Sequence, residues 1–295
     1  MKNFFIKVVC FLGIILLSYS PLISIAITDT YPEFNKSLID DITSGKSEVF
    51  GKGKPLMFSF HSNEDSRWQS GGIDHTHQYL TSVAIKTLIN DKGNKYENLI
   101  YPYAHKLLEG CDLPDIDETY PFYAHHFYNP YTNKNYLLGN ITAKTKFIEH
   151  INNAKELYPT DKYTSFSELG RALHYLSDIN EPHHSSSSPA FITNHVVYEK
   201  WVDEHRTYYT INFGTMYDLC FSESFNKFLN VAADKSASNS YRNSLAAQEL
   251  KIEPFGIYPL ILNDSDSWCK SANRTMTYCE DMITTVLFRF FEEVI

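Results

Sequence analysis

The sequence of 295 residues lacks several patterns that mark common classes of enzyme and binding protein. It contains no C-x-x-C pair, which argues against a zinc site built from cysteines. It contains no G-x-S-x-G, the motif that carries the serine nucleophile of many hydrolases. Lys and Arg total 26 against 35 Asp and Glu, and the formal charge of −9 opposes strong attraction to duplex nucleic acid. Any chemistry is therefore expected from other side chains.

The first 26 residues read as a secretory signal peptide. Lys2 and Lys7 precede an apolar run, and Ser24 to Ala26 form a small-residue cleavage site. A retained membrane anchor is the alternative, but Pro21 weakens the run as a bilayer span. The sequence thus predicts a protein that is secreted or lumenal in the secretory or endolysosomal pathway.

Two further features suit an exported protein. Four N-glycosylation triplets follow the signal, at Asn35, Asn140, Asn263 and Asn273. Four cysteines also follow it, at Cys111, Cys220, Cys269 and Cys279. In an oxidising compartment they predict two disulfides, in any of three pairings.

The remaining chain divides near Trp68 into a polar leader, residues 27–67, and a domain, residues 68–295. The leader shows one short expected helix, near Glu33 to Thr43. The domain has helical periodicity almost throughout and few strand patterns, so one all-α domain of several helices is expected. The expected helices cover residues 77–90, 99–110, 142–157, 165–180, 193–209 and 275–295. Ser165 or Ser167 could cap the fourth of these, and Pro182 should end it.

Histidines and carboxylates alternate in a pattern that indicates metal binding. His174 and Asp178 are four residues apart, as are His195 and Glu199, so each pair lies on one helix face. One such pair alone is more often a surface ion pair. Two pairs, with His184 between them, favour shared ligation of a divalent ion such as zinc. Further candidates upstream are His75, His77, Asp112, Asp115, Asp117, His125 and His126.

These segments resemble the zinc-dependent phospholipase C family, which includes the bacterial phosphatidylcholine-cleaving enzymes and the catalytic domain of alpha-toxin. The resemblance rests on "HFYNP", "LHYLSDINEPHH" and "HVVYE", and on Trp68 in the place of the family's N-terminal tryptophan. It implies an all-α domain of the type shared with single-strand nucleases, and three zinc ions. The implied ligands are Trp68, His77, Asp112, His126, His174, Asp178, His184, His195 and Glu199.

The resemblance also implies how these ligands divide among the ions. One ion would take Asp112, His126, His174 and Asp178. A second would take His184, His195 and Glu199. The third would take the Trp68 amine and carbonyl with His77 and Asp178. Their neighbours His75, His125 and His183 would be surface or supporting residues.

Two side chains receive roles in the reaction by the same resemblance. Asp112 would orient or deprotonate the attacking water, and Tyr123 would bind substrate. At the other head-group positions of the family this chain has Gly71 and Leu113, so a preference for choline is not implied. Because a backbone nitrogen can bind zinc only as a free amine, the Arg67–Trp68 bond must be cut for this site to form, and residues 27–67 are expected to keep the enzyme latent as a propeptide.

The expected function is that of a secreted phospholipase C, acting as a monomer on phospholipids at a membrane or micelle surface and activated by a protease that cuts after Arg67. Nucleic acid is not expected as a partner. The alternative is a single-strand nuclease or 3′-nucleotidase of the same fold. The spacing of nine residues from Trp68 to His77, and Glu199 as last ligand, favour the phospholipase. A secreted metal-binding protein without catalysis is a third reading.

Overall fold

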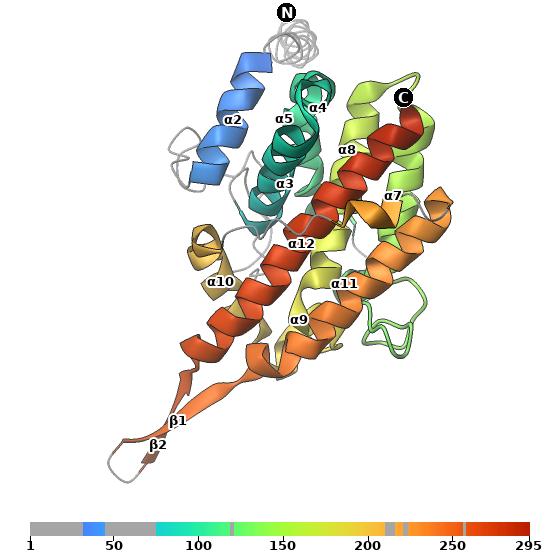
Figure 1. The fold of residues 1–295 in the computed structure, drawn as a ribbon. Helices are drawn as coiled ribbons and strands as arrows, with labels where there is room; N and C mark the ends of the chain where they lie inside the picture. Colours follow the sequence, from blue (N-terminus) through green and yellow to red (C-terminus); the bar gives the residue numbers. More distant parts are fainter. Residues whose placement is uncertain (1–31, 45–74, 119–120, 210–215, 221–223, 256–257) are drawn as a thin grey trace, which may run out of the picture.

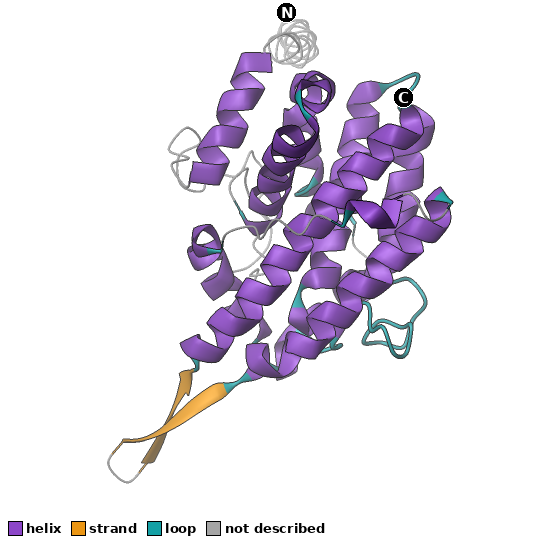
Figure 2. Cartoon of the chain, in the orientation of Figure 1, coloured by secondary structure: helices purple, strands orange, loops and turns teal. Residues whose placement is uncertain are grey.

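The computed structural model describes residues 32–44, 75–118, 121–209, 216–220, 224–255 and 258–295. They form a bundle of helices from which one β-hairpin projects (Figures 1 and 2). The longer helices are α2 (Pro32–Ser44), α3 (Thr76–Lys92), α7 (Ala143–Leu157), α8 (Lys162–Asn180), α10 (His195–His205), α11 (Phe225–Gln248) and α12 (Ser265–Val294). The shorter helices are α4 (Asn94–Ile100), α5 (Ala104–Gly110), α6 (Leu113–Asp117) and α9 (Pro182–Ser185), with 3₁₀ segments η1 (Tyr101–Tyr103), η2 (Pro121–His126), η3 (Ala190–Ile192), η4 (Arg206–Tyr208) and η5 (Tyr217–Cys220).

The all-α architecture expected from the sequence is confirmed, with the hairpin as its exception. The signal peptide, the bond after Arg67 and the ligand expected from Trp68 lie outside the described residues. None of the helices that the structure describes is both long and apolar enough to cross a bilayer.

Helix α8 forms the centre of the bundle, and its ends follow from local chemistry. The side chain of Asp161 accepts a hydrogen bond from the Thr164 amide and caps the helix, which therefore begins before the expected cap at Ser165. Ser165 instead lies inside α8 and donates to the carbonyl of Ala154 in α7. The helix ends at Asn180, two residues before Pro182, as expected.

A close approach of backbones holds α5 against α8. Gly110 and Gly170 face each other, and a Cβ atom on Gly170 would lie 2.1 Å from the carbonyl oxygen of Leu107. Only glycine fits at this contact. Because α8 also packs against α7, α11 and α12, its middle is surrounded by protein, and His174 and Asp178 are buried there.

The leader contributes helix α2, which matches the short helix expected near residues 33–43. Leu38, Ile39 and Ile42 of α2 are buried in the core, and the helix packs on α3, η1 and α5. Asn35 is buried and donates to the carbonyl of Tyr101 at 2.7 Å. Its amide is therefore engaged inside the fold, which corrects the expectation of a glycan at Asn35.

Helix α11 and the hairpin are elements that the sequence reasoning did not find. The buried face of α11 consists largely of alanine and serine, so its hydrophobic periodicity is weak. Strands β1 (Leu250–Phe255) and β2 (Tyr258–Asn263) pair antiparallel in the register Leu250 with Asn263 through Phe255 with Tyr258. Two prolines and a glycine in this segment obscure its strand pattern.

The expected disulfides are not formed. All four cysteines that the structure describes are free, and they lie in different surroundings. The thiol of Cys111 lies 3.4 Å from Thr81 Oγ1, Cys220 contacts the carbonyl of Thr285, and Cys269 is exposed beside Tyr209. The expectation was wrong. It rested on the expected oxidising compartment and on the even number of cysteines, neither of which fixes whether the fold brings two thiols within bonding distance.

Candidate metal centre

Five segments that are distant in the sequence bring imidazoles and carboxylates together beside the middle and C-terminal end of α8. Helix α8 supplies His174 and Asp178 from adjacent turns of its buried face. The α3, α6 and η2 segments add His77, Asp115 and His126, and the stretch from α9 to α10 adds Glu181, His184, His195 and Glu199. Their ligand atoms form three groups, in each of which all atoms lie within 4.8 Å of one another.

Asp178 connects these groups. Its Oδ2 lies 2.7 Å from His126 Nδ1 and 3.2 Å from His174 Nε2, and its Oδ1 lies 3.1 Å from His184 Nδ1. The other ring nitrogen of His174, Nδ1, donates to the carbonyl of Cys111 at 2.8 Å. This hydrogen bond orients the ring and presents Nε2 to the centre, the usual arrangement of a metal-binding histidine.

The first group consists of Asp115, His126 and His174. Asp115 Oδ1 lies 3.6 Å from His126 Nε2 and 3.8 Å from His174 Nε2. Asp112, the carboxylate expected here, belongs to none of the three groups. It precedes α6 as the N-cap residue of that helix. Three aspartates occur within six residues, and only the turn from α5 into α6 selects the one that meets His126.

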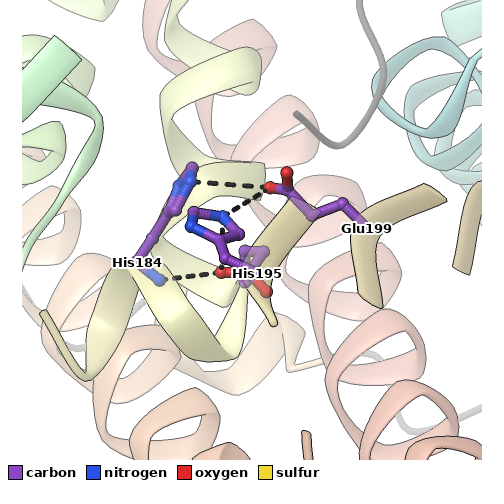
Figure 3. Close-up of side chains that lie close together, drawn as sticks. His184, His195 and Glu199 are labelled. Carbon is purple, nitrogen blue, oxygen red and sulfur yellow. Dashed lines mark hydrogen bonds and ion pairs between the residues drawn. The ribbon is translucent and has the colours of Figure 1, made fainter. Parts of the chain in front are cut away.

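The second group contains Glu181, His184, His195 and Glu199, all buried. Glu199 Oε1 lies 2.9 Å from His195 Nε2 and 3.6 Å from His184 Nε2, and Figure 3 shows both imidazoles facing this carboxylate. Glu181 was not expected. Its Oε2 lies 3.7 Å from His195 Nε2 and accepts a hydrogen bond from the His184 amide as the cap of α9. Pro182 suits the first position of a helix and so marks the residue before it as the N-cap, a signal that could have drawn attention to Glu181.

The third group contains His77, His174 and Asp178. The rings of His77 and His174 stack with their centroids 4.2 Å apart. His174 and Asp178 thus serve this group, and His174 also serves the first, so the groups form one continuous centre. The expected contribution of Trp68 to this group lies outside the described residues.

The neighbouring histidines differ from the selected ones in their contacts. His183 hydrogen-bonds to Glu181 Oε1 at 2.8 Å and to Asn194 Oδ1 at 3.0 Å, which supports the second group from behind. His75 lies at the start of α3, 3.3 Å from Asp203 Oδ2. His125 is buried against Tyr175 but belongs to none of the groups.

The carboxylates and burial shift the histidine pKa values in opposite directions. Burial lowers the pKa of His77 to about 3 and lowers that of His195 well below its usual range. Burial also opposes the charge on His174 and His184, but the neighbouring carboxylates, Asp178 foremost, together outweigh it and raise both pKa values to about 9. Burial opposes the charge on Asp178, but its contacts with His174, His126 and His184 hold its pKa well below the usual range.

The donor set fits zinc. Imidazole nitrogens and carboxylate oxygens, with no thiolate among them, suit Zn²⁺. Four buried carboxylates cluster here, an arrangement that costs stability unless cations neutralise them. In addition, His126 Nε2 and His195 Nε2 lie near the carboxylates of Asp115 and Glu199 without hydrogen-bond geometry, and His195 Nδ1 has no hydrogen bond within the described part of the chain. Buried imidazole nitrogens in that state are available as ligands.

An unusual backbone borders the centre in η2. Phe122 and Tyr123 both have φ near 55°, in the left-handed region that bulky side chains rarely adopt. This conformation costs about 1–2 kcal/mol per residue. It places the Tyr123 ring 5.9 Å from the ring of His126 and leaves Phe122 exposed. Tyr123, expected to bind substrate, therefore lies beside the first group.

The residues of the three groups fall within a known protein family. A sequence model of the family described as zinc dependent phospholipase C matches residues 76–243, more than half of the chain. The chain belongs to the zinc-dependent phospholipase C family. The matched span includes every residue of the three groups, from His77 to Glu199. Because the matching family is a phospholipase C family, the alternative of a single-strand nuclease or 3′-nucleotidase is not favoured.

Curated relatives carry the same family name. A phospholipase C of Paraclostridium bifermentans is 25% identical over 245 residues, which cover 74% of this chain and 59% of that protein. A phospholipase C of Listeria monocytogenes is 31% identical over 141 residues, 44% of this chain and 48% of that protein. The chain thus spans about half the length of the curated relatives it matches.

Solved structures agree with the fold. The alpha toxin from Clostridium absonum has a TM-score of 0.64 at 19% identity, over 79% of this chain and 66% of that one. The Clostridium perfringens alpha-toxin gives 0.65 at 19% identity, with the same coverage. At this identity the likeness concerns the fold alone, and it confirms the helical architecture.

Proposed function

We propose that this protein is a zinc-dependent phospholipase C, which hydrolyses the phosphodiester bond of glycerophospholipids to diacylglycerol and a phosphorylated head group. The observation that carries the proposal is the convergence of three buried donor groups on Asp178 and its neighbours, in a chain of this family. One isolated group would suit a structural ion. Several linked groups suit charge stabilisation on a phosphodiester.

Three zinc ions are proposed, one for each group. Asp115, His126 and His174 would hold the first with Asp178, and His184, His195 and Glu199 would hold the second with Glu181 nearby. His77 and Asp178 would hold the third, completed by the amine and carbonyl of Trp68. When bound, such ions neutralise phosphoryl oxygens, lower the pKa of a coordinated water and stabilise the leaving alkoxide.

The chain's own side chains would position the reactants around these ions. The catalytic role expected for Asp112, orienting or deprotonating the attacking water, stays a prediction. Tyr123 would contact the head group, because its ring lies at the edge of the first group. His183 is a positioning residue, since its hydrogen bond to Glu181 fixes the carboxylate that caps α9 beside His184.

Activation is proposed to require cleavage after Arg67, because an amide nitrogen at Trp68 has no lone pair to offer zinc. The contacts of α2 add a constraint to this scheme. The buried Ile39 and Ile42 and the hydrogen bond from Asn35 would keep the leader helix attached to α3 and η1 after the cut. The active form would then contain two chains held without a covalent bond.

The cellular setting is proposed from the sequence. A signal peptide at residues 1–26 would direct secretion, and the active protein would be a monomer. Glycans would be carried at Asn140, Asn263 and Asn273, whose side chains are exposed.

The deciding experiment is hydrolysis of a panel of phospholipids by protein purified with zinc and cut after Arg67. Diacylglycerol release that chelation stops and zinc restores would support the proposal. Glu199→Gln should remove most of this activity, and Asp117→Asn, at an exposed carboxylate outside the groups, should not. Cleavage of single-stranded DNA with no action on lipid would contradict the proposal. N-terminal sequencing of the active form should begin one chain at Trp68.

A further inference from the structure

The β1–β2 hairpin projects from the helical body. Figure 1 shows it extending beyond the adjoining ends of α11 and α12. Its strands pair with each other and with no other strand that the structure describes. The hairpin also lies outside the family match, which ends at residue 243. An element so placed contributes little to the hydrophobic core. Its sequence can therefore serve contacts with another molecule.

The composition of the hairpin is apolar toward its tip. Lys251 and Glu253 are its charged residues, and the eight residues 254–261, Pro-Phe-Gly-Ile-Tyr-Pro-Leu-Ile, carry no charge. In a chain with a net charge of −9, such a neutral segment favours an apolar partner over an ionic one. Phe, Tyr and Leu are residues typical of peptides that enter the interface of a bilayer.

A second copy of the chain is a poorer partner for this hairpin. An exposed strand edge can pair with another strand through its amide donors. Pro254 and Pro259 lie opposite each other in the register, and neither has an amide hydrogen to donate. Each edge is therefore interrupted near the tip, where extension by another strand would have to run.

The root of the hairpin is joined to the metal centre by hydrogen bonds. Near the end of α11, Gln248 Nε2 donates to Ser188 Oγ at 2.9 Å, and Asn194 Nδ2 donates to the Ala247 carbonyl at 2.9 Å. The segment 188–194 thus spans from the root to the residue before His195.

Two exposed apolar side chains lie within that segment. Phe191 is 76% exposed and Ile192 is 70% exposed. Aromatic rings continue from there to the centre, since Phe191 lies 6.3 Å from Tyr136, Tyr136 lies 4.7 Å from Phe127, and Phe127 lies 4.5 Å from the ring of His184. The exposed Phe191 is therefore connected to the proposed active site through packed aromatic rings, with Phe127 buried between them.

We propose that the hairpin, with Phe191 and Ile192 at its root, inserts into the surface of a phospholipid bilayer and brings the metal centre to its substrate. This inference rests on the proposed function. Because the inserting residues are apolar, the protein binds vesicles of neutral lipid, and added salt does not release it. Acidic lipid gives no advantage to a chain of this charge.

The test measures binding to phosphatidylcholine vesicles by cosedimentation, using the protein cut after Arg67 and purified with zinc. The variant Phe255→Ser/Leu260→Ser changes the tip, and a second variant replaces residues 251–262 by a short Gly-Ser turn. Ile295→Ser is the matched control, an exposed apolar residue at the other end of α12, about 45 Å away for a helix of 30 residues. A thermal midpoint within about 2 °C of the parent protein shows that each variant folds.

We expect both hairpin variants to bind vesicles on the order of tenfold more weakly, and the control to bind like the parent protein. Binding should persist between about 0.05 and 0.5 M salt, a range over which charge attraction is largely screened. Hydrolysis of dihexanoyl phosphatidylcholine, kept as monomers, should stay within about twofold, because the chemistry is untouched. Hydrolysis of vesicle lipid should fall with binding.

Several results would overturn the inference. They are a parent protein that does not bind the vesicles, hairpin variants that bind as well as the parent protein, or binding that salt abolishes. A hairpin-dependent dimer with unchanged vesicle binding would show that a second copy is the partner. Failure of the proposed function gives a different result. The protein then binds vesicles through the hairpin but hydrolyses neither vesicle lipid nor monomeric lipid.

Discussion

Replacing Asp115 by asparagine should remove one zinc ion from the centre, whereas the same change at Asp112 should leave the ions in place. The Asp115 side chain is 4% exposed, and its Oδ1 lies within 3.8 Å of the Nε2 atoms of both His126 and His174. Asparagine keeps the size of the side chain but removes the negative charge that a divalent ion requires there. The two variants therefore separate a ligand from a neighbour with little change in shape.

The expected size of the effect follows from the place of Asp115. Residues that only orient a ligand typically contribute about 10- to 100-fold to metal affinity. An anionic ligand in direct contact should contribute at least about 100-fold, equivalent to about 2.7 kcal/mol. Asp115→Asn should thus lose the ion of the first group during dialysis, and activity with it.

Bound zinc per chain, measured by inductively coupled plasma mass spectrometry, distinguishes the variants when combined with diacylglycerol release. Asp112→Asn should keep its zinc but lose hydrolysis, because a role in orienting water does not require ligation. Asp117→Asn is the control, since that side chain is 46% exposed and pairs with Arg171. If Asp112→Asn lost zinc and Asp115→Asn kept it, the assignment of the first group from the geometry would be refuted.

Four further changes test the fold and the centre. Chelation should lower the unfolding midpoint, because buried carboxylates lose their counter-ions, and zinc should restore it in a calorimetric scan; an unchanged midpoint would contradict the metal assignment. Burial opposes charge on His150, but the Glu118 carboxylate 3.0 Å from its Nε2 and the hydrogen bond of its Nδ1 with Glu168 raise its pKa above 6.5. That stabilisation is complete below about pH 6.5 and fades as pH rises through the higher folded pKa, so His150→Gln should cost more in urea unfolding at about pH 6 than at about pH 9. Ile42→Ala in α2 should cost about 2–5 kcal/mol of unfolding free energy, because Ile42 is buried in the core. Gly170→Ala should also destabilise the protein, because its Cβ would collide with α5. A variant as stable as the parent protein would refute the packing described at that residue.

The sequence by itself determined the features that depend on short spacings. His174 and Asp178, and likewise His195 and Glu199, must share a helix face because a turn has 3.6 residues. Periodic apolar positions likewise predicted α3, α7, α8 and α12, and the scarcity of strand patterns predicted an all-α domain. Such inferences need no knowledge of which helices meet.

Tertiary structure decided the features that depend on contacts between distant segments. The approach of Asp115 to His126 and His174, the place of Glu181 beside His195, and the separation of the cysteines all depend on how α5, α6 and α9 approach α8. The docking of α2 against α3 depends on a surface formed 40 residues later in the chain, and the projection of the hairpin depends on where α11 ends. Local sequence cannot supply these distances, because each one is set by side-chain packing across the whole bundle.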